Sequence, residues 1–290
     1  MSFPIIDIII LGCGPSTGVP VAGQAQPYWG ACDAKNPFNN RTRSSVYICT
    51  QGRGTLVDTT PDLRHHMLTH GLTELEHVII THDHADHLHG IDDLRPVFFK
   101  RQHPLSLMAD AITLEKIQKR FGYLLKNSQE DKNHSDNSAA DNCSSNNSPS
   151  HGLYPKIFNA TLLKSAWEWQ GLSCQSFQQN HGKSFSQGLR FGPIAYSTDF
   201  VDLDDTTLKS LENLDLWIVD CIGRTPKATH CHLDRTLMFI DKVKPKAAIL
   251  THMGPELDYE TLLKELPAHV RPAYDGLKIR LEEGRLTLLP

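Results

Sequence analysis

VIITHDHADH, residues 78–87, joins an apolar run to a cluster of three histidines and Asp86. The apolar residues predict a buried strand, which fixes the backbone of the residues that follow it. In a turn, His82 and His84 can direct their imidazoles toward one point, while Asp86 and His87 face a second point close by. Imidazole and carboxylate groups at this density are typical ligands of Zn²⁺ or Mn²⁺. The stretch therefore predicts two adjacent metal sites, not a solvated loop that is merely rich in histidine.

Around this stretch, short β-like runs alternate with amphipathic helical segments, which predicts an α/β fold with helices covering sheets. We expect strands at Ile5–Leu11, Ser45–Thr50, Thr55–Val57, Glu76–Thr81, Leu105–Ala109, Lys156–Leu163, Ser173–Gln179, Ile194–Ser197, Leu216–Asp220, Ala247–Thr251 and Leu277–Leu281. We expect one helix that starts at Thr59-Thr60-Pro61 and stops at Gly71, and others at Ala111–Phe121, Leu233–Asp241 and Tyr259–Leu266.

Residues 127–150 differ in composition from the rest of the chain. They contain no Val, Ile, Leu, Met or aromatic residue and are dominated by Ser and Asn. Such a segment cannot bury enough apolar surface to offset the entropy that it would lose on ordering. Strand-like segments resume after it. We therefore predict a disordered surface insertion within a single domain that spans residues 1–290.

Composition disfavours several classes of function. The 290 residues include 29 Lys and Arg against 33 Asp and Glu, without long runs of like charge, so nothing indicates binding to nucleic acid or to an anionic membrane. No apolar stretch approaches the roughly 18 residues of a membrane helix. The apolar start is too short, and lacks the basic residues, for a signal peptide. The seven scattered cysteines form no C-x-x-C pair, which predicts a reducing, cytoplasmic location.

The order H-x-H-x-D-H after a strand resembles the signature of the metallo-β-lactamase-fold hydrolase superfamily, and the resemblance extends over nearly the whole chain. Further similar motifs are Asn180-His181-Gly182, Ser197-Thr198-Asp199 and Thr251-His252-Met253. The resemblance implies a four-layer αβ/βα sandwich, in which two mixed β-sheets are flanked by helices. It also implies two metal sites that share Asp199, one completed by His82, His84 and His181 and the other by Asp86, His87 and His252. Asp58 matches an aspartate that orients the ligands from outside the metal sites.

Within the superfamily, the flanking segments are similar to the phosphoribosyl cyclic phosphodiesterase branch of phosphonate breakdown. The similar pieces are Leu11-Gly12-Cys13-Gly14, Gly18-Val19-Pro20, Asp220-Cys221, His230-Cys231-His232-Leu233 and Tyr274-Asp275-Gly276. The resemblance implies that His230 acts on the substrate phosphate, with His232 beside it, whereas the residues alone also fit a histidine pair that caps the following helix. That branch carries a structural zinc on clustered cysteines and a histidine. Here Cys32 stands alone and Pro255 takes the place of the histidine, so we expect no structural zinc.

These features predict a hydrolase that uses two divalent metal ions, zinc or manganese, to cleave a small cyclic or nucleotide-like phosphodiester. Two ions that share Asp199 would activate a water molecule and neutralise charge on the phosphoryl group. Asp86, Asp199 and His230 are the predicted catalytic residues, and His230 would protonate the leaving oxygen or stabilise its charge. We expect a small phosphodiester as the partner, no membrane and no nucleic acid, and the sequence is compatible with a homodimer.

Other functions stay open at this point. A transfer-RNA 3′-end endonuclease shares the metal motif, but it inserts a long RNA-binding arm where only 17 residues separate His181 from Asp199 here. A glyoxalase-type thioester hydrolase would need a helical tail of its own, which the sequence does not show. A non-catalytic metal- or nucleotide-binding module would keep the ligands without turnover. The sequence also leaves open whether Arg95 binds phosphate or pairs with neighbouring aspartates.

Overall fold

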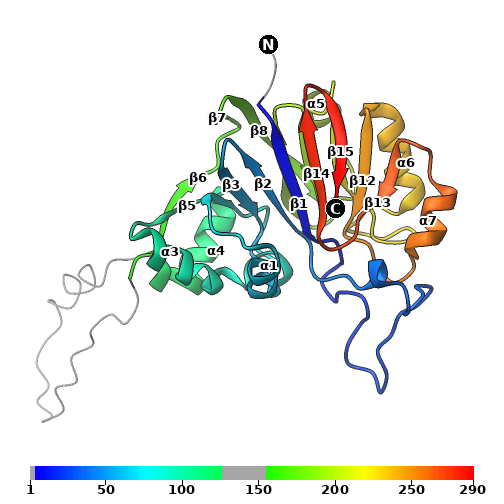
Figure 1. The fold of residues 1–290 in the computed structure, drawn as a ribbon, viewed down its shortest axis with the longest axis horizontal. Coiled ribbons are helices and arrows are strands. Elements are labelled where there is room, and N and C mark those ends of the chain that lie inside the picture. Colours follow the sequence, from blue (N-terminus) through cyan, green and yellow to red (C-terminus); the bar gives the residue numbers. More distant parts are fainter. Residues whose placement is uncertain (1–3, 126–154) are drawn as a thin grey trace, which may run out of the picture.

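A computed structural model describes residues 4–125 and 155–290 of the chain. The insertion predicted at residues 127–150 lies outside the described residues. Within them, two β-sheets face each other and helices cover the outer side of each sheet (Figure 1). This is the predicted four-layer sandwich.

The first sheet has eight strands among the described residues. Their order is β15 (Arg285–Leu289), β14 (Leu277–Glu282), β1 (Ile6–Gly12), β2 (Ser45–Thr50), β3 (Arg53–Val57), β4 (Leu75–Ile79), β5 (Leu105–Ala109) and β6 (Phe158–Leu162). The strands from β15 to β3 pair antiparallel, whereas those from β3 to β6 pair parallel. The parallel half is important for function. Because β3 and β4 are parallel, both end at the same edge of the sheet, and the residues that follow them lie close together.

The second sheet has seven strands in the same part of the chain. Their order is β13 (Val270–Pro272), β12 (Ala247–Thr251), β11 (Leu216–Asp220), β10 (Ile194–Ser197), β9 (Ser184–Phe191), β8 (Leu172–His181) and β7 (Ala166–Trp169). The strands from β10 to β13 are parallel, and β8 to β10 form an antiparallel meander. Both sheets are therefore mixed, as the sequence predicted.

Helices complete the outer layers. They are α1 (Leu63–His70), α2 (Ala85–Leu88), α3 (Arg95–Arg101), α4 (Ala111–Phe121), α5 (Asp205–Ser210), α6 (Leu233–Val243) and α7 (Tyr259–Glu265), with 3₁₀ turns η1 (Pro37–Asn39), η2 (Ile91–Leu94) and η3 (Gly122–Leu124). One core cluster lies between the sheets and under α6 and α7, and a second lies between the first sheet and α1, α3 and α4. Among the described residues, no helix is both long and apolar enough to cross a membrane.

The predicted strands are all present, with small shifts at their ends. The predicted start of the first helix was wrong, because α1 begins at Leu63 and Asp62 occupies its N-cap position. The Thr60 hydroxyl instead accepts a hydrogen bond from the Asp62 backbone N–H and closes the preceding turn. We did not predict β7, β9, β13 or β15. In β9, Ser, Gln and Gly break the apolar pattern.

Candidate metal centre

The predicted ligands lie where strands of both sheets end. Asp58 follows β3 and His82 follows β4, and these two strands are parallel neighbours. From the second sheet, β8 ends at His181, Asp199 comes two residues after β10, and His252 follows β12. The facing sheets thereby bring together five segments that are far apart in the sequence.

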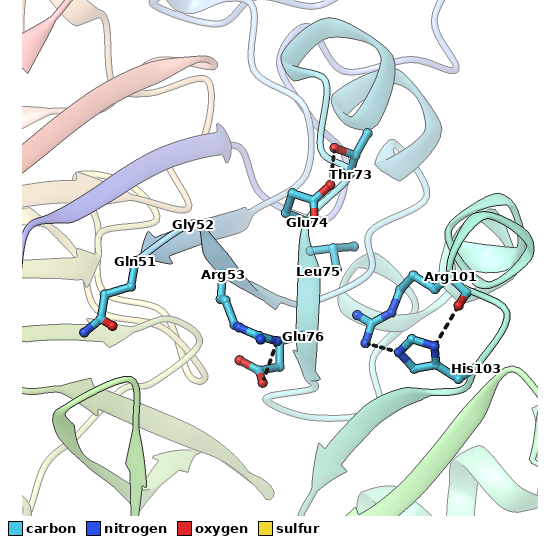
Figure 2. A pocket seen from close by; sticks show the side chains of 9 residues that line it. All are labelled: Gln51, Gly52, Arg53, Thr73, Glu74, Leu75, Glu76, Arg101 and His103. Atoms are coloured by element: carbon cyan, nitrogen blue, oxygen red, sulfur yellow. Dashed lines mark hydrogen bonds and ion pairs between the residues drawn. The ribbon is translucent and has the colours of Figure 1, made fainter.

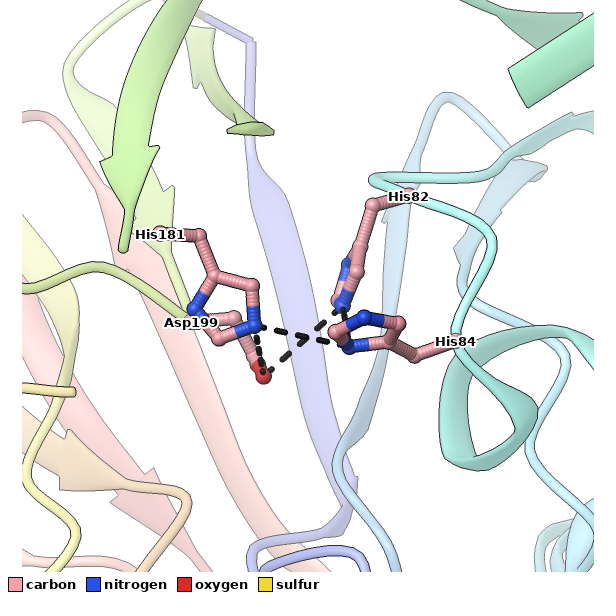
Figure 3. Close-up of side chains that lie close together, drawn as sticks. All are labelled: His82, His84, His181 and Asp199. Carbon is pink, nitrogen blue, oxygen red and sulfur yellow. Dashed lines mark hydrogen bonds and ion pairs between the residues drawn. The ribbon is translucent and has the colours of Figure 1, made fainter. Parts of the chain in front are cut away.

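Four residues form the first candidate site. His84 Nδ1 lies 2.9 Å from His82 Nε2 and 3.4 Å from His181 Nε2. Asp199 Oδ1 lies 3.8 Å from the Nε2 atoms of both His82 and His181. Figure 3 shows the three rings and the carboxylate converging on one point. This arrangement is suited to one ion held by three nitrogens and one oxygen.

The other oxygen of Asp199 faces a second set of groups. Its Oδ2 lies 3.1 Å from His87 Nε2 and 3.2 Å from His252 Nδ1. Asp86 Oδ2 lies 3.3 Å from His87 Nε2. The structure therefore brings together all seven predicted ligands and places Asp199 between the two sets. Their binding of metal stays a prediction.

Hydrogen bonds on the outer side of the rings determine which nitrogens carry protons. His181 Nδ1 donates to the Thr229 carbonyl at 2.7 Å, and His87 Nδ1 donates to Asp58 Oδ2 at 2.7 Å. A neutral imidazole has one N–H, so the Nε2 atom of His181 carries a lone pair. His87 differs, because the negative charges of Asp199, Asp58 and Asp86 outweigh its burial and raise its pKa well above the usual value. His87 Nε2 is buried, has no hydrogen-bond partner and faces two carboxylates. Imidazoles and carboxylates that converge in this way are stabilised by positive charge among them, which either a proton on His87 or a metal ion supplies, so the donor set fits divalent metal ions.

Burial lowers the pKa values of His82, His181 and His252. A lowered pKa keeps these imidazoles neutral at physiological pH, which is the form that binds metals. Asp58 accepts hydrogen bonds from the backbone N–H and the hydroxyl of Thr81, whose hydroxyl in turn lies 3.1 Å from His82 Nδ1. Asp58 thus orients His87 directly and His82 through Thr81, in agreement with its predicted place outside the metal sites.

Three residues of the centre have backbone angles in the left-handed region, with φ of 67° at Asp58, 55° at Asp199 and 58° at His252. Non-glycine residues adopt this conformation at a cost of order 1–3 kcal/mol each. Each of the three comes directly or two residues after a strand, and the sharp turn there directs its side chain into the space between the sheets. Other described residues, such as Gln51 and Lys244, share this conformation, so it is not confined to the metal centre.

His230 lies beside the centre, whereas His232 does not join it. The His230 ring stacks on His252 with centroids 4.8 Å apart, and its Nε2 lies 3.9 Å from Asp199 Oδ1. His232 is the N-cap residue of α6, although its side chain makes no capping hydrogen bond. The substrate-binding role of His232 stays a prediction, and the missing capping hydrogen bond gives the capping interpretation no support beyond the position of His232 at the helix start.

Sequence reasoning missed Asp220 as a site residue. It is fully buried at the end of β11, and its Oδ2 lies 3.5 Å from His230 Nδ1. Burial alone would lower the pKa of His230, but the negative charges of Asp220 and Asp199 outweigh burial and raise this pKa to about 9. An aspartate after an apolar strand, the pattern that singled out Asp58, was the available signal.

A second buried polar cluster lies beside the centre, and we call it the Arg41 cluster: Arg41, Asn39 and Cys32 with the carbonyls of residues 253, 254 and 257. The Arg41 guanidinium donates to Leu257 O at 2.6 Å, Gly254 O at 3.1 Å and Asn39 Oδ1 at 3.1 Å. Arg41 is only 1% exposed. Because the segment that follows His252 is bound in this way, Arg41 supports the position of that ligand.

The ligand end of the first sheet contrasts with its opposite end, where a pocket of about 390 Å³ opens at the starts of β3 and β4 (Figure 2). Its polar groups have partners: Arg53 forms an ion pair with Glu76 at 3.5 Å, Glu74 pairs with Lys100 at 3.2 Å, and the Arg101 guanidinium lies 3.1 Å from His103 Nε2. No set of converging lone pairs is present among these residues. The chemistry of the described chain is therefore expected at the metal centre.

Solved structures share this fold along their whole length. A crystal structure described as a new diphosphatase from the PhnP family has a TM-score of 0.81 and 29% sequence identity, and the match covers 98% of this chain and 99% of that chain. Zn²⁺-bound PqqB from Methylobacterium extorquens matches with a TM-score of 0.65 and 17% identity over 94% of this chain and 99% of that one. The short form of human tRNase Z matches with a TM-score of 0.58 and 17% identity over 94% and 98%.

A curated relative is named an octanoyltransferase and comes from Porphyromonas gingivalis. It is 26% identical over 282 residues, which are 95% of this chain but only 51% of the relative. The chain thus spans about half the length of the curated relative that it matches.

The sandwich fold and the converging His and Asp side chains define a metal-dependent hydrolase. The domain model of the beta-lactamase superfamily matches residues 53–253, and the chain belongs to this superfamily. The predicted family and fold are therefore confirmed, and so is the resemblance to the branch that contains the PhnP-family diphosphatase.

Proposed function

We propose that this protein is a phosphodiesterase that uses two divalent metal ions to hydrolyse a small phosphodiester. The observation that carries this proposal is the His230–Asp220 pair beside the metal centre. Asp220 Oδ2 lies 3.5 Å from His230 Nδ1 and its negative charge raises the pKa of His230, so this ring would serve as a proton donor next to the groups that would hold the metals. Hydrolysis of an ester with an alkoxide leaving group needs such a donor. The likeness to a diphosphatase at 29% identity supports phosphorus chemistry.

The residues of the chain divide the work as follows. His82, His84, His181 and Asp199 would hold one ion, and Asp86, His87, His252 and Asp199 the other. When bound, two such ions would supply Lewis-acid activation of water and neutralise charge on the phosphoryl group. His230 would donate the proton on its Nε2 to the leaving oxygen, while Asp220 stabilises the charged ring through Nδ1. Asp58 would keep His87 in the tautomer that presents its Nε2 lone pair to the centre.

The test combines metal analysis with a substrate panel. Protein purified without chelators is analysed for bound zinc, manganese and iron, then reloaded with two equivalents of each. The reloaded samples are assayed on cyclic nucleotides, cyclic sugar phosphates, linear diesters, a precursor transfer RNA, S-lactoylglutathione and a β-lactam. We expect hydrolysis of small diesters. Turnover of the thioester or the lactam alone would overturn the proposal, turnover of transfer RNA alone would favour the nuclease, and no turnover at all would favour a binding module.

A variant separates the proton donor from the metal ligands. His230→Ala should keep two ions per chain while kcat falls by about 10²-fold, the range of general acid catalysis. The loss should be smaller for a p-nitrophenyl ester, whose leaving group needs no proton, than for an alkyl ester. Equal losses on both esters, or unchanged turnover, would remove His230 from the proposed role.

A further inference from the structure

One carboxylate joins three segments that are far apart in the sequence. Asp275 lies in the turn before β14, and its Oδ1 accepts a hydrogen bond from the Cys13 backbone N–H at 3.0 Å. Its Oδ2 accepts two more, from the Thr42 backbone N–H at 2.7 Å and from the Thr42 hydroxyl at 2.6 Å. Cys13 follows β1, and Thr42 precedes β2. Asp275 therefore fixes the segment after β1 against the segment before β2.

The two segments that Asp275 joins also contact each other directly. The Gly14 N–H donates to the Thr42 carbonyl at 2.7 Å. A Cβ atom on Gly12 would overlap the Arg43 carbonyl oxygen, and one on Gly14 would lie 2.8 Å from the Thr42 carbonyl oxygen. Only glycine allows two backbones to approach each other so closely. The glycines of the segment after β1 therefore allow the close packing that Asp275 secures.

The Cys13 carbonyl in turn binds the residue that follows a predicted ligand. The Met253 N–H donates to this carbonyl at 2.7 Å, and Met253 is fully buried. Met253 directly follows His252, whose φ of 58° lies in the left-handed region. A non-glycine residue keeps this conformation only where its surroundings hold it. The bonds from Cys13 to Asp275 and from Met253 to Cys13 therefore form one continuous support for the backbone at His252.

We propose that Asp275 is a positioning residue of the metal centre, which holds the His252 imidazole in place through Cys13 and Met253. This inference goes beyond the proposed function, because it concerns the affinity for metal and not the reaction that the ions would promote. The alternative is that Asp275 only stabilises the fold. A general loss of stability would leave both metal sites unchanged or weaken them together, whereas lost positioning weakens only the site that contains His252.

Chelator competition tests this role by measuring the affinity of each metal site in wild type, Asp275→Asn and Asp110→Asn. Asparagine replaces one acceptor oxygen by a donor, so it cannot accept all three hydrogen bonds that Asp275 accepts. Asp110 is a matched control, because its carboxylate also accepts hydrogen bonds from two backbone N–H groups and a threonine hydroxyl, all in the first turn of α4. His252→Ala identifies the site that His252 completes.

We expect Asp275→Asn to weaken the site that contains His252 and to leave the other site unchanged. The loss should be about tenfold in affinity, the lower end of the range for residues that orient ligands, because Asp275 acts through two further residues. Asp110→Asn should change neither affinity. Equal losses at both sites in Asp275→Asn, or no loss at either, would overturn the inference.

Amide hydrogen exchange of the metal-free protein tests the series of hydrogen bonds without any ion. Local opening determines how fast an amide exchanges, so the Met253 N–H should exchange faster in Asp275→Asn than in wild type. An unchanged rate, or an equal increase in Asp110→Asn, would overturn the inference.

Neither measurement needs turnover, which keeps the result separate from the proposed function. If two ions bind, Asp275→Asn weakens only the site that contains His252, and no diester is hydrolysed, the phosphodiesterase proposal fails and the role of Asp275 stands. If diesters are hydrolysed and both affinities are unchanged in Asp275→Asn, the role of Asp275 fails alone.

Discussion

The metal centre includes His252, and the Arg41 cluster binds the carbonyls of the segment that follows it. The two clusters differ in how their buried polar groups are satisfied. In the centre, imidazole nitrogens and carboxylates face one another, and His87 Nε2 lies 3.1 Å from Asp199 Oδ2. In the Arg41 cluster, a guanidinium of the chain itself fills the middle and donates to Asn39 Oδ1 and to backbone carbonyls. A built-in cation gives permanent support, whereas a cation taken from solvent can exchange and can act on a substrate. The comparison predicts that the Arg41 cluster provides stability and that the metal centre provides activity.

Asp199→Asn should give the largest effect, because it removes the charged oxygens that serve both halves of the centre. We expect kcat/KM to fall by about 10³-fold or more, since the charge stabilisation lost amounts to several kcal/mol. Elemental analysis should find at most one ion per chain instead of two. Asp202→Asn is the control, because Asp202 is exposed and pairs with Arg235 at 2.9 Å. Full occupancy by two ions in Asp199→Asn would show that this carboxylate is no bridge.

Arg41→Met should disrupt the Arg41 cluster, the second region of the comparison. It leaves several buried acceptors without a donor, at about 1–3 kcal/mol each, so we expect a loss of about 3 kcal/mol in the free energy of unfolding. Urea unfolding in the presence of chelator measures this loss without a contribution from metal. Arg190→Met is a matched control, because Arg190 also donates to backbone carbonyls, at Gly192, Ser210 and Glu212.

Both arginine variants should lose stability, but only Arg41→Met should also weaken metal binding. Arg41 holds the residues directly after His252, whereas Arg190 contacts none of the ligand segments through these bonds. Competition with a fluorescent chelator gives the affinity of each site. Equal metal affinity in the two variants would limit Arg41 to general stability.

The same comparison shows what sequence reasoning can reach. The segment from His82 to His87 was predictable because its ligands are local and follow an apolar strand. His181, Asp199 and His252 are each unremarkable alone, and their recognition depended on the order of motifs in a family resemblance. The structure brings them to His82 because β8, β10 and β12 end at the edge that faces β4.

The supporting contacts could not be predicted, because they join residues far apart in the sequence. Arg41 binds carbonyls of residues more than 200 positions away. Every residue has a backbone carbonyl, so the sequence does not indicate which of them accept a hydrogen bond from a side chain. The α4 helix was predicted with the correct bounds, but its contact with Asp83 crosses 33 residues at Lys116. Asp220 carried a weak signal, its place at the end of an apolar strand, and its partner His230 was known only by resemblance.

Asp58→Asn tests how the first sheet orients the metal centre. Asparagine keeps the shape but replaces one acceptor oxygen by a donor, so it disturbs the hydrogen bonds to His87 and Thr81. Substitutions of such orienting residues typically weaken metal affinity by about 10–100-fold. Chelator competition measures this affinity, and Asp62→Asn, which alters an ion pair with Arg43 near the surface, serves as control. An unchanged affinity would show that the His87 tautomer is set without Asp58.

Asp220→Asn should give the smallest effect and the clearest pH signature. A proton donor acts only while it holds its proton, so activity is lost as the pH rises through the pKa of His230, which the charge of Asp220 raises. Removing the charge of Asp220 lowers this pKa, because burial then acts against fewer opposing charges. The alkaline limb of the kcat profile should therefore move to lower pH, with turnover above the limb reduced by about tenfold for each unit by which the pKa falls.

A matched variant decides whether that limb belongs to His230. His230→Gln removes the titrating ring, so its kcat should be low throughout and its profile should lack the limb that Asp220→Asn shifts. Metal content should stay at two ions in both variants, because neither residue belongs to the proposed ligand sets. If the limb persists unchanged in His230→Gln, the titrating group lies elsewhere. In that case Asp220 would have only a structural role at the end of β11. The centre would then lack the proton donor that the phosphodiesterase proposal requires.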